Sequence, residues 1–62
     1  MIENPKIGQR VRIKAPHVPF HRELGEITAL LPTTALEVRL DRQPVDMNGR
    51  VVQVGRDQVE AV

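Results

Sequence analysis

The two histidines, His17 and His21, are the residues whose type and spacing best suit metal binding. They lie four positions apart, a spacing that would place both imidazoles on one face of a helix. Pro19 stands between them and excludes a helix at this point. Glu23 could supply a third ligand, but nothing in the pattern requires it. We therefore expect no metal site and two solvated loop histidines.

Catalytic chemistry has few candidate residues in this chain. Cysteine and tyrosine are absent, as is serine, so the usual nucleophile–base pairs cannot be formed. Asp41 and Asp46 are loop acids without an evident partner. We predict that the protein is not an enzyme and holds no cofactor. The lack of cysteine also excludes disulfides and thiolate zinc sites.

A basic stripe is the clearest candidate for binding. Its members alternate with apolar residues, so they share the outward face of a predicted strand. This face could meet an acidic protein or a phosphate backbone. The alternative is a charged exterior that keeps the protein soluble, and Glu37 and Asp41 dilute the positive field. The stripe consists of Arg10, Arg12 and Lys14, and Arg39 and Arg42 can extend it.

Phe20 is the only aromatic residue, and it lies in a proline-rich loop over residues 16–24. If exposed, it would serve as an anchor for a partner. If buried, it would fill one end of an otherwise aliphatic core, which is the interpretation we favour. The lack of Tyr and Trp argues against binding of single strands by base stacking. The predicted partner-binding residues are Arg10, Arg12, Lys14, Phe20 and Arg39.

Five short strands are predicted from period-two alternation and from turn residues. In the second strand, Ile27, Ala29 and Leu31 are expected on one face, and Glu26, Thr28 and Leu30 on the other. A 3₁₀ turn over residues 55–58 is expected before the last strand, with Asp57 accepting local backbone N–H groups. The predicted strands cover residues 9–15, 25–31, 35–40, 50–54 and 59–62.

This arrangement predicts an all-β, five-stranded SH3-like barrel with a 3₁₀ turn before the last strand. Barrel closure removes exposed sheet edges, which suits a small β protein. The 62 residues allow one domain, residues 1–62, with a flexible lead-in over residues 1–6. A chain this short without disulfides is marginally stable, so we expect support from a partner or from a homo-oligomer.

Four motifs lie at characteristic positions along the chain. They are Val11-Arg12-Ile13 with Pro16, Glu23-Leu24-Gly25, Val38-Arg39-Leu40-Asp41 and an acidic close over residues 57–62. In order and spacing they resemble subunit IV of photosystem I, and in outline the variable chain of ferredoxin–thioredoxin reductase. This resemblance implies a small accessory subunit of a larger complex, related to electron transfer.

Two other SH3-like families are similar in part. Pro19-Phe20 followed by Gly25-Glu26-Ile27 resembles the KOW element of ribosomal and transcription proteins, which implies a nucleic-acid or ribosome-associated module. Val51-Val52-Gln53-Val54 resembles the active-pore strand of the type II dihydrofolate reductases, which implies an oligomeric enzyme. That strand carries a tyrosine in the reductase family, and this chain has none.

Charge and hydropathy narrow the choice of partner and location. The net charge is +1, with nine basic and eight acidic residues, so a clear basic excess typical of nucleic-acid binding is missing. The chain has no apolar run near the length of a membrane span and no signal-peptide pattern. We therefore expect a cytoplasmic, non-catalytic protein–protein interaction module, with nucleic acid as the alternative partner.

Overall fold

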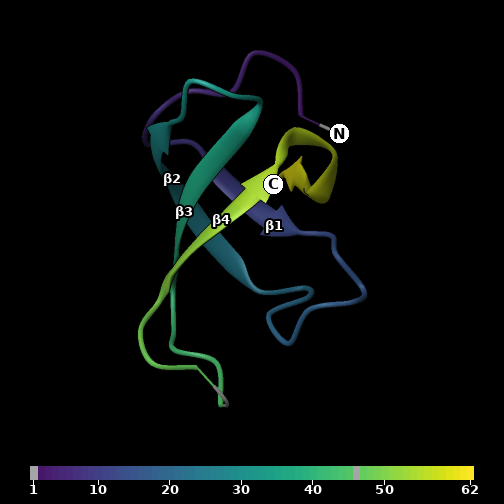
Figure 1. The fold of residues 1–62 in the computed structure, drawn as a ribbon, viewed down its shortest axis with the longest axis vertical. Helices are drawn as coiled ribbons and strands as arrows, with labels where there is room; N and C mark the ends of the chain where they lie inside the picture. Colours follow the sequence, from purple (N-terminus) through teal and green to yellow (C-terminus); the bar gives the residue numbers. More distant parts are fainter. Residues whose placement is uncertain (1, 46) are drawn as a thin grey trace.

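The computed structural model describes residues 2–45 and 47–62 and shows an all-β protein. Five strands form one antiparallel sheet in the order β4-β3-β2-β1-β5. Figure 1 shows β3 between β2 and β4. A single 3₁₀ turn, η1, lies before the last strand, as the sequence predicts. The elements are β1 (Arg10–Ile13), β2 (Leu24–Leu30), β3 (Ala35–Leu40), β4 (Val51–Gly55), η1 (Arg56–Gln58) and β5 (Val59–Ala61).

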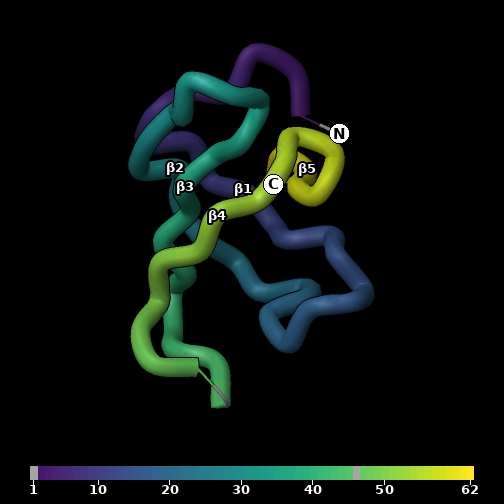
Figure 2. The backbone as a smooth tube through the Cα atoms, viewed as in Figure 1, coloured from purple at the N-terminus to yellow at the C-terminus, as the bar shows by residue number. Residues whose placement is uncertain are grey.

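The sheet brings the two ends of the chain together. β1 pairs with β2 on one side and with β5 on the other, and β3 and β4 continue from β2 as antiparallel neighbours. Figure 2 shows β5 beside β1, close to both termini. Within the described residues no ladder joins the edge strands β4 and β5, so the sheet is not closed. The prediction of an all-β, five-stranded fold is confirmed. Among the described residues, no strand pairing closes this sheet into a barrel.

The core lies on one face of this sheet and is entirely aliphatic at its centre. The alternation predicted in the first and third strands is confirmed, because the side chains at every second position are buried while Arg10, Arg12 and Arg39 are exposed. Burying these Val, Ile and Leu side chains supplies the main drive for folding. The buried hydrophobic residues are Ile2, Val11, Ile13, Ala15, Ile27, Leu36, Val38, Leu40, Val52, Val54 and Val59.

A β-bulge changes the faces of the second strand. Ile27 pairs with Val38, but the register shifts before Ala29, and Leu30 pairs with Leu36. Residues that pair directly point to the same face of a sheet, so Leu30 lies on the core side and Ala29 does not. Thr28 keeps its predicted outward face, where its hydroxyl donates to Glu37 Oε1, but the predicted alternation is wrong from Ala29 on, because one extra residue reverses the side chains that follow it. Leu30 remains 48% exposed.

The N-terminal segment takes part in the fold. Ile2 is 3% exposed and packs in the core, and its N–H donates to the Arg56 carbonyl at 3.0 Å. In the 3₁₀ turn, the Gly55 N–H donates to Gln58 Oε1 at 2.8 Å, so Gln58 makes the local bond that was predicted for Asp57. No helix in the described part of the chain is long and apolar enough to cross a membrane.

Candidate functional site

The outer face of the sheet carries a row of alternating charges. Arg10 on β1 pairs with Glu26 on β2, and Glu26 pairs with Arg39 on β3. Neighbouring side chains on one face approach closely enough for opposite charges to attract. Arg10 and Arg39 therefore do not form one continuous basic surface, because a carboxylate stands between them.

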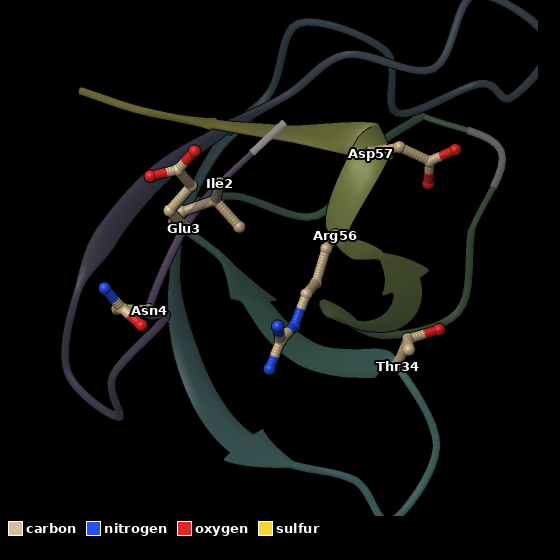
Figure 3. A pocket seen from close by; sticks show the side chains of 6 residues that line it. All are labelled: Ile2, Glu3, Asn4, Thr34, Arg56 and Asp57. Atoms are coloured by element: carbon tan, nitrogen blue, oxygen red, sulfur yellow. The ribbon is translucent and has the colours of Figure 1, made fainter.

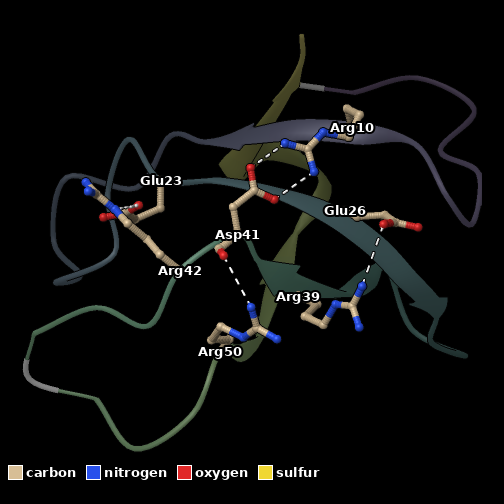
Figure 4. Close-up of polar contacts among 7 residues, drawn as sticks. All are labelled: Arg10, Glu23, Glu26, Arg39, Asp41, Arg42 and Arg50. Carbon is tan, nitrogen blue, oxygen red and sulfur yellow. Dashed lines mark hydrogen bonds and ion pairs between the residues drawn. The ribbon is translucent and has the colours of Figure 1, made fainter.

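Asp41 neutralises this row further. Arg10 donates two hydrogen bonds to its carboxylate, from Nη1 to Oδ1 at 2.7 Å and from Nη2 to Oδ2 (Figure 4). The hydrogen bond from Arg10 lowers the pKa of Asp41, and the charges of Arg10, Arg50 and Arg39 act in the same direction. The same hydrogen bond raises the pKa of Arg10. Arg39 lies 4.0 Å from Glu26, so both predicted binding residues have acidic neighbours.

Arg12 and Lys14, by contrast, border an open hollow of about 570 Å³ together with Arg22. None of the ion pairs that the described residues form within 4.0 Å involves these three cations. Glu60, which pairs with Arg12 across β1 and β5, is the only carboxylate in the lining. The hollow is lined by Arg12, Ile13, Lys14, Pro16, His21, Arg22 and Glu60.

His21 helps to hold the loop that forms one wall of this hollow. Its Nδ1 accepts a hydrogen bond from the Ala15 N–H at 3.0 Å, so Nδ1 carries no proton in this arrangement. His17 is exposed and His21 is half-buried, so they are not equivalent loop residues. Among the described residues, no group of three or more His, Cys, Asp and Glu side chains could hold a metal ion.

Phe20 lies on the inner side of the same loop. It is half-buried and packs against the core with Val18. The ring therefore stabilises the loop from below, and only part of it is accessible to a partner. Asp46, the other loop acid considered in the sequence, lies outside the described residues.

Two further hollows flank the sheet. One lies between the N-terminal segment, the β2–β3 turn and η1, where the Arg56 guanidinium extends between Asn4 and Thr34 (Figure 3). Glu3 and Asp57 also border it, so two acidic residues surround the single cation Arg56.

The second of these hollows is lined by Arg22, Glu23, Leu24, Asp41 and Arg42, and there Arg42 Nε donates to Glu23 Oε1 at 3.1 Å. The first loop and the 41–50 loop meet at this point.

Sequence patterns did not identify Arg22 as a candidate. It lies outside the alternating segment, and its approach to Arg12 and Lys14 depends on how the first loop folds back. The excess of Arg and Lys around this loop was the only available signal.

Comparison with family models, curated proteins and solved structures gives no match for this chain.

Proposed function

We propose that this protein is a non-catalytic interaction module that binds another protein through the Arg12–Lys14–Arg22 hollow. The observation that carries the proposal is the convergence of three cations, without ion-pair partners among the described residues, in one open depression. Cations left unpaired at a concave surface raise the local concentration of anionic partners and speed their association.

The proposed fold family is the SH3-like barrel. The strand order, the antiparallel meander of β2, β3 and β4, and the 3₁₀ turn before β5 support it. In this proposal the sheet curls so that β4 and β5 approach at the open side. Together with the motif resemblance, this supports a small accessory subunit of a larger complex, including complexes that transfer electrons.

The lining of the hollow supports binding more than catalysis. Neither a hydroxyl nor a thiol side chain is among its residues, so it offers no nucleophile to an acylation or phosphorylation reaction. Its one histidine already uses Nδ1 as an acceptor for the Ala15 N–H. The hollow can therefore orient and hold an anionic group, which is the chemistry of a recognition surface.

Affinity purification from the native cell tests this function. We expect tagged wild-type protein to retain a specific partner and the Arg12→Glu/Lys14→Glu variant to lose it. The control is Lys6→Glu/Arg56→Glu, which makes the same change in net charge at exposed positions away from the hollow. Equal loss in both variants, or recovery of this chain alone, would contradict the proposed surface.

A further inference from the structure

Arg22 adopts an unusual backbone conformation for a residue with a side chain. Its φ is +72°, in the left-handed region that favours glycine. The Arg22 N–H donates to the Ile13 carbonyl at 2.9 Å, and the Ile13 N–H donates to the Glu23 carbonyl at 2.9 Å. Two consecutive residues therefore oppose Ile13, which defines a β-bulge whose first position is normally glycine.

This bulge places Arg22 at the lip between two hollows. Arg22 lines the depression that contains Arg12 and Lys14, and it also lines the one that contains Asp41 and Arg42. Glycine would satisfy the same two backbone hydrogen bonds without strain, but it would remove the positive charge at this position. An arginine at a strained position next to two other cations indicates a binding role for its side chain.

We propose that the hollow binds an acidic, extended peptide segment of the partner, with Arg22 as a binding residue that the left-handed bulge holds in place. The proposal rests on the proposed function and specifies the chemistry of its partner. A guanidinium can bind a carboxylate through two parallel hydrogen bonds, so Arg12 and Arg22 each suit one acidic side chain. Lys14, the residue directly after β1, adds a third positive charge.

The charge pattern around the hollow favours a peptide over a nucleic acid. Glu60 offsets one of the three cations, which leaves a net charge of about two within the lining. Beyond the hollow, the outer face alternates in sign through the Arg10–Asp41, Arg39–Glu26 and Arg42–Glu23 pairs. A phosphate backbone binds through a longer track of cations, whereas two or three carboxylates match this short one.

Arg22→Gly tests the inference because it changes binding and stability in opposite directions. We expect its thermal midpoint to rise, since glycine relieves the left-handed strain. We also expect its affinity for a fluorescein-labelled peptide of alternating Glu and Gly residues to fall about tenfold, the loss of one charge-assisted contact. Arg22→Lys keeps the positive charge and should retain more of the affinity than Arg22→Gly.

Arg42→Gly is the matched control. Arg42 is exposed, lines only the neighbouring hollow, and pairs with Glu23. We expect this variant to bind the peptide like wild type and to show no rise in thermal midpoint. Wild-type affinity in Arg22→Gly, or equal losses in both variants, would overturn the role of Arg22. A lower midpoint in Arg22→Gly would overturn the inferred strain.

The outcomes for the function and for the inference can be separated. If wild type captures its native partner but does not bind the acidic peptide, the inference fails and the proposed function stands. If a single-stranded oligonucleotide of equal charge binds more tightly, with a steep dependence on salt, the peptide assignment is overturned. If the Arg12→Glu/Lys14→Glu variant retains its native partner, the proposed surface itself is wrong.

Discussion

The two halves of the outer face of β1 carry the same kind of residue but differ in their surroundings. Arg10, at the start of the strand, is held by Asp41 and lies beside Glu26. Arg12, two residues later, faces an open hollow with Lys14 and Arg22. Both arginines have a carboxylate as a cross-strand neighbour, Glu26 for Arg10 and Glu60 for Arg12, so the difference comes from Asp41, which binds Arg10 from the end of β3. We refer to these regions as the paired half and the open half.

The paired half also connects three strands. Asp41 follows β3, its N–H donates to the Leu24 carbonyl of β2, and its carboxylate binds Arg10 of β1. These contacts link β1, β2 and β3, so the charges of the paired half stabilise the sheet. The open half has backbone links, such as the Lys14 N–H to the Gln58 carbonyl, but none of the ion pairs within 4.0 Å among the described residues involves its cations.

The largest expected effect comes from a substitution at Gly25, where β2 packs closely against β3. A Cβ at Gly25 would lie 2.7 Å from the Arg39 carbonyl oxygen and 2.8 Å from Val38 Cγ1. We expect Gly25→Ala to lower the free energy of unfolding by about 2–3 kcal/mol, because β3 must move away. Urea denaturation would measure it, and binding should fall with the loss of folded protein.

Gly55→Ala is the matched control for this substitution. A Cβ there would lie 2.8 Å from Asp57 Oδ1, the end of an exposed side chain that can move. We expect a much smaller loss of stability than for Gly25→Ala. Equal destabilisation by both substitutions would show that the close packing of β2 against β3 does not govern stability at Gly25.

The second prediction separates the two halves by binding. We expect Arg12→Gln to weaken binding of the acidic peptide about tenfold, because it removes one charge-assisted contact. Arg10→Gln should leave the affinity nearly unchanged, since Asp41 already occupies that guanidinium. Fluorescence anisotropy would measure both affinities. Equal losses would mean that the paired half also contacts the partner.

The third prediction concerns stability in the paired half. We expect Arg10→Gln and Asp41→Asn each to lower the urea midpoint slightly, and the double variant to lower it by less than their sum. The reason is that both substitutions remove the same pair. The effect should be small and should shrink at high salt, because both side chains are half-exposed. Additive losses would show that the two residues act independently.

The smallest expected effect is a dependence on pH. Because Arg10 lowers the pKa of Asp41 in the folded protein, this carboxylate stabilises the fold above its ordinary pKa of about 3.9. That contribution is lost as the pH falls through the lower folded-state pKa. The difference in urea midpoint between wild type and Asp41→Asn should therefore decrease from pH 7 toward pH 3. A constant difference would contradict the assigned pKa direction.

Local patterns predicted much of the fold. Strict alternation located β1 and β3 with their faces, because side chains of an extended chain point alternately to opposite sides. The Gly55–Gln58 segment was recognised as a turn. The bulge before Ala29 was not predicted, because the extra residue cannot be recognised from the spacing of the apolar residues in this strand. Burial of Ile2 was also missed, because one apolar residue in a polar segment shows no period.

The candidate site was predicted less well than the fold. Arg12 and Lys14 lie in the open half, but Arg10 and Arg39 from the same predicted surface lie beside carboxylates. Phe20 is half-buried against the core. Sequence spacing could not separate these cases, because Asp41 lies 31 positions from Arg10 in the chain.

The sequence by itself determined an all-β chain with an aliphatic core and a charged outer face, because these properties follow from alternation and composition. Only the tertiary structure decided which charges are paired. Pairing depends on strand register, on the way the first loop folds back, and on the left-handed bulge at Arg22. Electrostatic interactions fall off with distance in space, so residues far apart in the chain determine whether each cation is paired or open to a partner.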